Sequence, residues 1–396
     1  MTQRALGLGV IGLGMAGAVM VRAAARHPGT VLTAAADPQA GPREAFGRDF
    51  NARTYADARA LCEDPAVEAV YIATPHQFHA EHAVLAAERG KHVILEKPMA
   101  LTLADCDRII AAVERAKVHL IVGHTHAFDS AVREMRGLIA SGELGALGMI
   151  ASWNYTNYLY RPRRPEELDT SKGGGILFNQ VPHQIDTVRL LGGGLVRSVR
   201  AQAGVLDPTR PTEANCAAFL EFADGVPATL VYSGYDFFDT DELHFWVSER
   251  GAPKTPGHGA ARRALAERKR QGGEEAGLRT QLAGYGSQDE GEPPHQPHFG
   301  LTIATCARGD LRASADGVFV YGEEGRREIA LPGGGKYSGR HNVLDDLREA
   351  IRTGAKPVHD GRWGKATVEV ALAIQQSARE RREITLDHQV AAPDIR

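Results

Sequence analysis

The sequence predicts an α/β protein: a doubly wound parallel sheet, followed by an α+β domain with an open, mainly antiparallel sheet. In the first 125 residues, short apolar runs alternate with amphipathic stretches, as in βαβ units. Beyond that point most runs alternate apolar and polar residues, as half-exposed antiparallel strands do. A length of 396 residues also favours two domains. We therefore expect one domain over residues 1–125 and a second over 126–396, with an insertion at about 250–297.

The first domain opens with the apolar run Leu6–Ile11, which predicts a buried strand. The helix predicted next, Met15–Arg26, is rich in Ala and Val and ends before Pro28. Thr102 and Asp105 form a capping-box pattern at the start of a later helix. The other predicted strands are Val31–Ala36, Ala69–Ala73, His92–Leu95 and His119–Val122, and the other helices are Pro42–Phe50, Ala56–Glu63, Gln77–Arg89 and Leu103–Ala116.

The second domain is predicted to be rich in strands. The expected strands are Met149–Tyr155, Val196–Val205, Ala217–Phe222, Ala228–Tyr235, His244–Ser248, Leu311–Ala313, Val318–Tyr321 and Glu328–Leu331. The expected helices are Gln180–Leu191, Val343–Thr353 and Lys365–Arg382. The insertion is rich in Gly, Pro, Arg and Glu, which favours a solvated surface segment with a short helix at Ala260–Gln271. A lid over the active site and an oligomer contact remain alternatives.

The composition excludes several classes of protein. A net charge of −3 gives no reason to expect nucleic acid or an anionic membrane as a partner. The four cysteines lie far apart without metal-type spacing, so we expect no disulfide framework and no metal site. No apolar run approaches the roughly 20 residues that span a bilayer. These features predict a cytoplasmic protein.

A glycine-rich loop, Gly12-Leu13-Gly14-Met15-Ala16-Gly17, follows the first predicted strand. Gly12 permits a tight turn, Gly14 lets the backbone approach a pyrophosphate, and Gly17 lets the helix pack against the strand. The helix start at Met15 and Ala16 then presents backbone N–H groups to the phosphates. The loop therefore predicts a dinucleotide-binding Rossmann domain.

Asp37 ends the next predicted strand, 20 residues beyond Gly17. In this position a carboxylate accepts hydrogen bonds from the adenosine ribose hydroxyls. It also repels a 2′-phosphate, which favours NAD over NADP. The alternative is that Asp37 is only a turn residue before Pro38.

Two further features offer groups for proton transfer. Lys97, in Glu96-Lys97-Pro98, follows a strand whose carboxyl end should border the ligand crevice. Beside a cationic nicotinamide its ammonium form is disfavoured, so it can exchange a proton, although such a lysine is more often a surface residue. His183 follows Gly173-Gly174-Gly175 and can exchange a proton with a substrate hydroxyl, although a single histidine in an apolar helix is more often structural. Asn179, four residues earlier, should share its helix face.

Together these segments resemble the glucose–fructose oxidoreductase / inositol dehydrogenase (Gfo/Idh/MocA) family over nearly the whole chain. The resemblance also rests on Ala73-Thr74-Pro75 with His79, on Gly142-Glu143-Leu144-Gly145, and on Ile351-Arg352-Thr353-Gly354 before Pro357. It implies an NAD(P)-dependent dehydrogenase that is often oligomeric through the sheet of its second domain, so we expect a homodimer or homotetramer. It implies that Lys97 and His183 are catalytic. It also implies that Thr74, Pro75 and His79 line the nicotinamide side and that Glu96 and Lys97 touch the cofactor.

Two departures from the family pattern argue against an ordinary polyol substrate. The family often has Asp at position 179, where this chain has Asn179, and Gly at position 181, where it has Val181. An Asn side chain cannot take a proton, so Lys97 and His183 would have to suffice. The family's sugar dehydrogenases tend to carry an Arg near position 126, where this chain has His126.

The run from Asn179 to Asp186, the insertion and the segment His298–Tyr321 resemble the phthalate dihydrodiol dehydrogenase branch of this family. That resemblance implies NAD-dependent oxidation of a cis-dihydrodiol of an aromatic dicarboxylate to the catechol, with tautomerisation to the aromatic ring as the driving force. A carboxylated small molecule needs cationic partners, and guanidinium groups can clamp carboxylates. The candidate substrate-binding residues are Tyr160, Arg161, Arg163, Arg164, His124, His126, Asn179 and His183.

Three alternatives stay open. The arginine segment is also typical of a solvated basic loop. The fold also suits a sugar or cyclitol dehydrogenase. A non-catalytic dinucleotide-binding sensor is the third alternative, and the presence of both Lys97 and His183 argues against it.

Overall fold

The computed structural model describes residues 4–123, 125–272, 274–275, 285, 293–332 and 337–392. They form two compact units, each described by itself below. The first unit holds the described residues up to 123, Tyr285 and Arg340–Val368, and the second holds the remaining described residues. The chain therefore returns to the first unit near its end.

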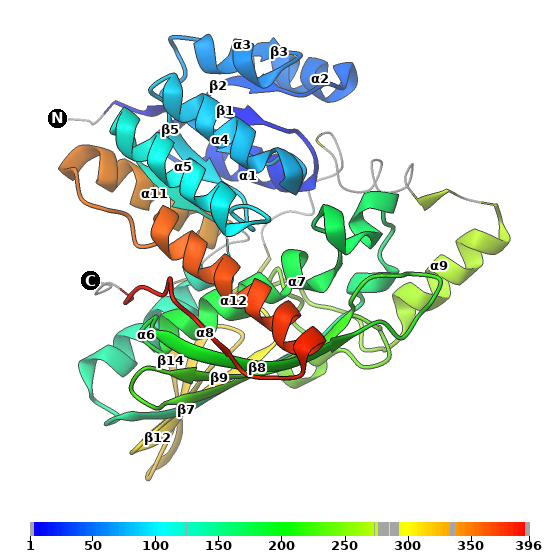
Figure 1. Ribbon diagram of the computed structural model, residues 1–396, viewed down its shortest axis with the longest axis vertical. Helices are drawn as coiled ribbons and strands as arrows, with labels where there is room; N and C mark the ends of the chain where they lie inside the picture. The colour runs from blue at the N-terminus through cyan, green and yellow to red at the C-terminus, as the bar shows by residue number, and fades with distance from the viewer. Residues whose placement is uncertain are drawn as a thin grey trace. The chain divides into compact units, whose positions relative to one another are not determined.

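The first unit contains a six-stranded parallel sheet in the order β3-β2-β1-β4-β5-β6 (Figure 1). All six residues of β1 are buried, because helices cover both faces of such a sheet. The strand order reverses between β1 and β4, and ligands of doubly wound sheets bind at the carboxyl ends of the strands at such a point. The strands are β1 (Leu6–Ile11), β2 (Thr30–Ala36), β3 (Arg53–Tyr55), β4 (Ala69–Ile72), β5 (His92–Leu95) and β6 (Leu120–Val122).

Among the described residues, six α-helices and the start of a seventh accompany this sheet. The helices α4 and α5 lie side by side (Figure 1). The Thr102 hydroxyl accepts a hydrogen bond from the backbone N–H of Asp105 at 3.1 Å, which confirms the predicted cap of α5. The helices are α1 (Met15–Arg26), α2 (Ala40–Phe50), α3 (Ala58–Glu63), α4 (His79–Glu88), α5 (Leu103–Ala116), α11 (Ser338–Thr353) and α12 (Gly361–Glu380).

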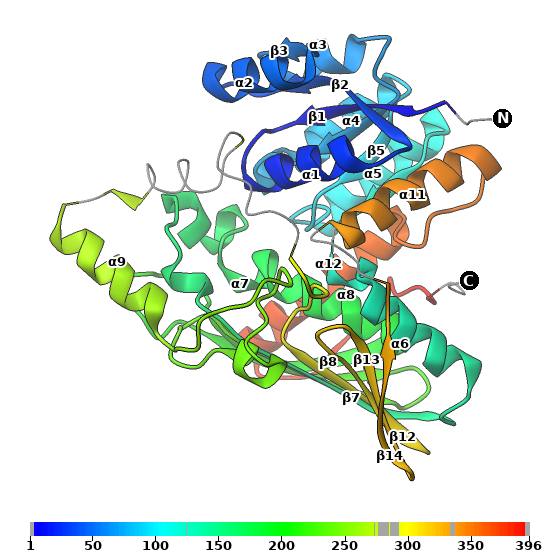
Figure 2. The same ribbon diagram turned by 180° about the vertical axis from the view of Figure 1, so that it is seen from behind.

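The second unit contains a nine-stranded sheet in the order β14-β13-β12-β11-β7-β10-β9-β8-β15. Neighbouring strands pair antiparallel except β7 and β10, which pair parallel. Figure 2 shows β12, β13 and β14 together at one end of it. The strands are β7 (Leu147–Tyr155), β8 (Val196–Gly204), β9 (Asn215–Phe222), β10 (Pro227–Ser233), β11 (Leu301–Cys306), β12 (Gly309–Ala313), β13 (Gly317–Gly322), β14 (Gly325–Ala330) and β15 (Ile384–Thr385).

Helices cover one face of this sheet and leave the other exposed. All 11 residues of α8 are buried, and α8 contacts β7 and β10. In β7, Ile150, Ser152 and Asn154 are buried, whereas Met149 and Trp153 point to the exposed face. This alternation is the period-2 pattern of a half-buried strand. The helices of this unit are α6 (Ser130–Ser141), α7 (Gly175–Asn179), α8 (Val181–Leu191) and α9 (Ala260–Arg270).

The two sheets confirm the predicted fold class, but several predicted elements differ. The strand predicted at His244–Ser248 is wrong, because Phe245 and Trp246 adopt φ values of 58° and 57°, which an extended strand excludes. The helix α6 and the strand β11 were not predicted. Among the described residues, no helix combines the length and apolar character needed to cross a membrane.

Candidate active site

The glycine loop between β1 and α1 has the shape that a dinucleotide requires. Gly12 has a φ of +93°, and a Cβ on it would lie 2.7 Å from the carbonyl oxygen of Ala73. A Cβ on Gly17 would lie 1.9 Å from the carbonyl oxygen of Gly12, so only glycine allows this helix–strand approach. Around Gly14 the described part of the chain places no atom within 4 Å of a Cβ position. Exposed Met15 and partly exposed Ala16 begin α1 beside this open space, which fits a pyrophosphate at the helix N-terminus.

Asp37 lies directly beside that loop, at the end of β2. Its Oδ2 accepts a hydrogen bond from the backbone N–H of Leu13 at 2.8 Å, and its Oδ1 accepts one from Gln39 at 2.9 Å. The guanidinium of Arg43 donates to the carbonyl oxygen of Asp37 at 2.6 Å. The carboxylate is therefore held in a fixed position at the glycine loop, where a cofactor ribose is expected.

The ring of His79 lies within hydrogen-bond distance of two backbone segments, one after β4 and one after β5. Its Nδ1 lies 2.8 Å from the carbonyl oxygen of Pro98, and its Nε2 lies 3.0 Å from that of Thr74. Burial lowers the pKa of His79, so the ring is neutral at pH 7 and donates to one of the two oxygens at a time. Its side chain has no exposed surface, whereas Thr74 and Pro75 are partly exposed. His79 therefore acts as a positioning residue for Thr74 and Pro98 rather than lining a cofactor surface.

Glu96 and Lys97 follow β5 and face different surroundings. The buried carboxylate of Glu96 accepts hydrogen bonds from the Tyr71 hydroxyl and, at 3.2 Å, from the backbone N–H of Lys97. Burial and the Glu96 charge together raise the pKa of Tyr71, which keeps it a hydrogen-bond donor. Lys97 is partly exposed. The buried Glu96–Tyr71 pair thus fixes the backbone that carries Lys97.

In the second unit, His183 lies in a cluster of aromatic rings. The ring centroid of His183 is 5.0 Å from that of His126 and 4.9 Å from that of Phe299. Phe299 also stacks on His126, at 4.8 Å, and on Tyr232, at 6.3 Å. The Tyr232 hydroxyl donates to Oε1 of Gln180 at 3.2 Å. The structure therefore brings two predicted residues, His126 and His183, together with two that were not predicted, Phe299 and Tyr232.

His126 belongs to a chain of alternating charges. Its Nδ1 lies 2.6 Å from Oδ2 of Asp129, and its Nε2 lies 3.4 Å from Oε1 of Glu249. The other oxygen of Glu249 lies 3.6 Å from the guanidinium of Arg161, whose Nε donates to Asn157 at 2.6 Å. Burial lowers the pKa of His126, but the carboxylates of Asp129 and Glu249 outweigh it and raise the pKa to about 9. Burial likewise raises the pKa of Glu249, but His126 and Arg161 hold it well below its usual value. At pH 7 His126 is thus a cation.

The three arginines of the predicted cluster have different surroundings: Arg161 lies beside Glu249, whereas Arg163 and Arg164 have other partners. Arg161 has 34% of its side chain exposed. The buried Arg163 donates two hydrogen bonds to the carbonyl oxygen of Tyr158 and pairs with Glu167 at 3.3 Å. Arg164 pairs with Glu166 and Glu167, of which Glu167 also pairs with Arg163. Arg161 is therefore the candidate for binding a carboxylate.

Two other candidates serve the local structure. The Tyr160 hydroxyl is buried and donates to Asp207 at 2.7 Å. The amide of Asn179 donates to the carbonyl oxygens of Gly173 and Gly175, at 2.9 and 2.8 Å. Asn179 therefore holds the glycine loop before α8, which an Asp could not do as a donor. His124, also predicted to bind substrate, lies outside the described residues.

Asp129, Glu249, Tyr232 and Phe299 are the site residues that sequence reasoning missed. The spacing of three between His126 and Asp129 is a signal that could have revealed their pairing. Glu249 and Phe299 reach the cluster from distant parts of the chain, and nothing in their local sequence marks them. A cavity of about 20 Å³ also borders His126, which is room for one water molecule rather than for a substrate. In the described part of the chain, no three His, Cys, Asp or Glu residues are arranged to hold a metal ion.

The glycine loop, the fixed Asp37 and the parallel sheet define an NAD-binding oxidoreductase with a second, mainly antiparallel domain. Residues 6–124 match the family described as "Oxidoreductase family, NAD-binding Rossmann fold", and residues 132–249 match the "GFO/IDH/MocA C-terminal domain". The chain belongs to the Gfo/Idh/MocA family of NAD-dependent oxidoreductases, as its sequence motifs predicted.

Individual relatives agree with this assignment. The 1-carboxy-3-chloro-3,4-dihydroxycyclohexa-1,5-diene dehydrogenase of Comamonas testosteroni is 39% identical over 380 residues, which is 94% of each chain. The crystal structure of a putative dehydrogenase from Bordetella bronchiseptica RB50 is 47% identical, with a TM-score of 0.92, over 96% of this chain and all of that one. An oxidoreductase from Agrobacterium radiobacter in complex with NAD+, L-tartaric acid and magnesium has the same fold, with a TM-score of 0.68 at 18% identity over 96% of this chain and 98% of that one.

Proposed function

We propose that this enzyme oxidises a carboxylated cyclohexadiene cis-diol to the corresponding dihydroxy aromatic acid, with NAD+ as the acceptor. The observation that carries the proposal is the 39% identity, over 94% of each chain, to a dehydrogenase named for such a ring. That name describes a ring with two double bonds that carries one carboxyl group, one chlorine and two neighbouring hydroxyls. The partly exposed Arg161 and the cationic His126 supply the positive charge that a carboxylate needs.

The residues that we assign to proton transfer are Lys97 and His183. The glycine loop and Asp37 would hold NAD+, which would supply the acceptor for the hydride of the carbinol carbon. Lys97 and His183 are proposed to accept the hydroxyl proton, which leaves a ring ketone, and transfer of a proton from the neighbouring ring carbon to the ketone oxygen then gives the aromatic dihydroxy acid. Asn179 takes no part in proton transfer, because its amide donates to two backbone carbonyl oxygens.

The arrangement of the arginines favours one substrate carboxylate over two. The sequence motifs suggested a dicarboxylate held by Arg161, Arg163 and Arg164, but Arg163 is buried against Glu167 and Arg164 pairs with Glu166 and Glu167. Around Arg161 the cations His126, Arg161 and Arg250 outnumber the carboxylates of Asp129 and Glu249 by one, which leaves one positive charge for a substrate carboxylate. A second substrate carboxylate would find no further cation in this group, which is unfavourable.

The test is NADH formation from a panel of substrates that differ in one group at a time. The panel contains a cyclohexadiene cis-diol with one carboxyl group, with two, and with none, together with myo-inositol and glucose. We expect the highest kcat/KM for the monocarboxylate. Turnover of the polyols without turnover of any diol would overturn the proposal in favour of a sugar or cyclitol dehydrogenase, and NAD binding without any turnover would favour a sensor.

We also propose that the protein self-associates through the exposed face of the nine-stranded sheet. Met149, Trp153 and Phe219 expose 49%, 46% and 46% of their surface on this face. On neighbouring strands Val231 lies beside Trp153, so the apolar surface is continuous. Contiguous apolar surface of this kind is typical of protein–protein contacts.

A further inference from the structure

We propose that the insertion after Glu249 is a scaffold that fixes Arg161, and that Glu275 is the contact through which it selects a carboxylated substrate. The substrate class in this proposal rests on the proposed function. The sequence predicted a solvated segment with a short helix at Ala260–Gln271, and the structure has this helix at Ala260–Arg270 with only Leu265 buried. The described part of the insertion also contacts the chain on both sides of Arg161.

Glu275 forms a bidentate ion pair with Arg210. The two guanidinium nitrogens of Arg210 lie 2.9 Å from the two carboxylate oxygens, and Arg210 is only 1% exposed. Glu275 also accepts a hydrogen bond from the backbone N–H of Arg163 at 3.1 Å. Burial raises the pKa of Glu275, but Arg210 outweighs it and lowers the pKa, so the pair stays charged. Bidentate pairs of this kind set geometry as well as energy.

The Arg210–Glu275 pair holds the backbone around Arg161 from two sides. Arg210 donates to the carbonyl oxygen of Arg161 at 3.4 Å, and Glu275 holds the N–H of Arg163 two residues on. Within the segment, the backbone N–H of Arg161 donates to the carbonyl oxygen of Asn157 at 3.2 Å. With its backbone fixed, Arg161 can keep its guanidinium beside Glu249.

Helix α9 of the insertion supports the residue before Arg161. The guanidinium of Arg262 lies 4.0 Å above the ring of Tyr160, and Leu265 packs in the same buried cluster as Tyr160. The carboxylate of Asp236 accepts a hydrogen bond from the backbone N–H of Arg262 at 2.8 Å, which caps the first turn of α9. The helix is thus docked at its start and along its buried side.

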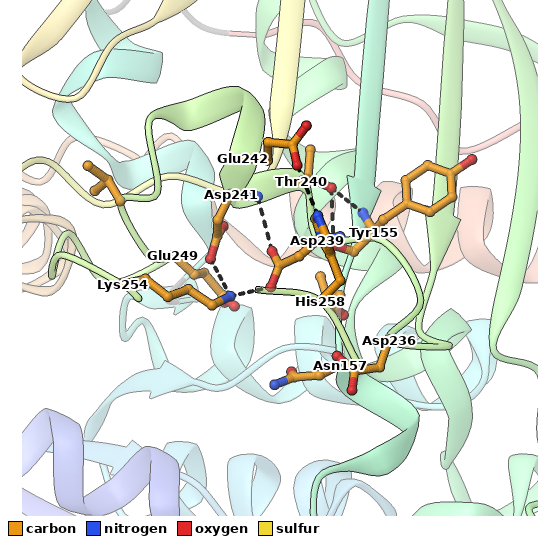
Figure 3. Close-up of polar contacts among 12 residues, drawn as sticks. Tyr155, Asn157, Asp236, Asp239, Thr240, Asp241, Glu242, Glu249, Lys254 and His258 are labelled. Carbon is orange, nitrogen blue, oxygen red and sulfur yellow. Dashed lines mark hydrogen bonds and ion pairs between the residues drawn. The ribbon is translucent and has the colours of Figure 1, made fainter. Parts of the chain in front are cut away.

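The beginning of the insertion is anchored as well (Figure 3). Lys254 pairs with Asp239 and, at 2.8 Å, with Asp241. His258 lies 2.9 Å from Glu242 and accepts a hydrogen bond from the backbone N–H of Asp239 at 3.1 Å. Glu249, the acidic partner of Arg161, directly precedes this anchored stretch. The insertion therefore fixes both members of the Arg161–Glu249 pair.

The test compares Glu275→Gln with Glu274→Gln, a substitution of the exposed neighbouring residue. With Glu275→Gln we expect KM for the monocarboxylated diol to rise about tenfold, with kcat within about twofold and KM for the diol without a carboxyl group unchanged. Glu274→Gln should change none of these. Equal KM increases for both diols would overturn the proposed selectivity, because they would indicate a general structural loss.

A double-mutant cycle tests whether Glu275 acts through Arg161. In an Arg161→Met background, Glu275→Gln should not raise KM for the monocarboxylate further, because the guanidinium that Glu275 positions has already been removed. Additive effects would overturn the proposal.

Amide hydrogen exchange separates a failure of this inference from a failure of the proposed function, because it needs no substrate. Glu275→Gln should speed exchange in residues 158–164, and Glu274→Gln should not. Unchanged exchange would overturn the scaffold even if the diol is turned over. Faster exchange in an enzyme that turns over no diol would support the scaffold and overturn only the substrate class.

Discussion

Nδ1 of His126 lies 2.6 Å from Oδ2 of Asp129, and both side chains are buried within the second unit. A buried imidazolium is stable only beside a negative charge, and this contact provides one. Together with Glu249 it raises the pKa of His126 to about 9, from an ordinary value of 6.5. The cation beside His183 is therefore part of the folded structure at neutral pH.

This pKa predicts that the protein loses stability in mild alkali. The pKa of His126 is higher in the folded state than in the unfolded state. Its contribution to the free energy of unfolding is therefore fully present below about pH 6.5 and is lost as the pH rises through 9. The difference corresponds to about 3 kcal/mol at most. Urea unfolding at pH 6, 7.5 and 9 should show a fall in the free energy of unfolding. Asp129→Asn should be less stable at pH 6 and much less dependent on pH, and an equal pH dependence in both proteins would contradict this assignment.

Asp37 is predicted to set the choice of cofactor. Asp37→Ser removes the carboxylate that would bind the ribose hydroxyls and repel a 2′-phosphate, so KM for NAD+ should rise about 10- to 100-fold while use of NADP+ improves. Arg43, which contacts the carbonyl oxygen of Asp37, should then help to bind the 2′-phosphate. Steady-state kinetics with both cofactors measure this. Adding Arg43→Ala to Asp37→Ser should remove the gain with NADP+, and an unchanged cofactor ratio in the single variant would refute the role of Asp37.

Much of the fold could be predicted because its signals are local. Runs such as Leu6–Ile11 are apolar throughout and are followed by helices with clear ends, so their composition and boundaries mark the parallel sheet. The segment His244–Ser248 has the composition of a strand, but its two positive φ values depend on the turn it forms in three dimensions. The composition of the segment alone therefore does not predict this turn.

The candidate site was predictable only where a motif marks it. Lys97 and His183 stand in recognisable motifs, whereas Glu249 and Phe299 are ordinary residues brought to His126 by the folding of distant segments. Arg161, Arg163 and Arg164 look equivalent in the sequence. Their burial and partners distinguish them, and these are properties of the tertiary structure alone.

The two outer arginines of that segment allow a matched comparison of carboxylate binding. Arg161→Met should raise KM for a monocarboxylated diol about 10- to 100-fold, because a charge-assisted hydrogen bond is lost. Arg164→Met removes the same group from a side chain that is 43% exposed and already pairs with Glu166 and Glu167, so KM should change less than about twofold. Initial-rate kinetics with carboxylated and uncarboxylated diols give the comparison. If both variants behaved alike, Arg161 would not be the carboxylate anchor.

Lys97 is predicted to act in proton transfer rather than in binding NAD+. Lys97→Met should lower kcat about 10²- to 10⁴-fold, which is the usual contribution of a general acid or base. The dissociation constant of NADH, followed by fluorescence titration, should change little, because the glycine loop and Asp37 remain. Lys172→Met is a suitable control, since Lys172 is 60% exposed and pairs with Asp169 on the surface. A parallel loss of NADH binding would assign Lys97 to cofactor binding instead.

If the protein self-associates through the exposed face of the nine-stranded sheet, a charged substitution on this face should dissociate the oligomer. Trp153 lies on β7 beside Val231 of β10, and a charge there would be buried without a partner in any contact made by this face. Light scattering coupled to gel filtration should therefore find a dimer or tetramer for the unmodified chain and a smaller species for Trp153→Arg. Leu206→Arg, at a residue that is 70% exposed outside the strands of the sheet, should leave the mass unchanged. An unpaired arginine in a packed interface costs enough free energy to separate the subunits. If Trp153→Arg kept the full mass of the oligomer, this face would therefore not be the contact. A monomeric unmodified protein would rule it out as well.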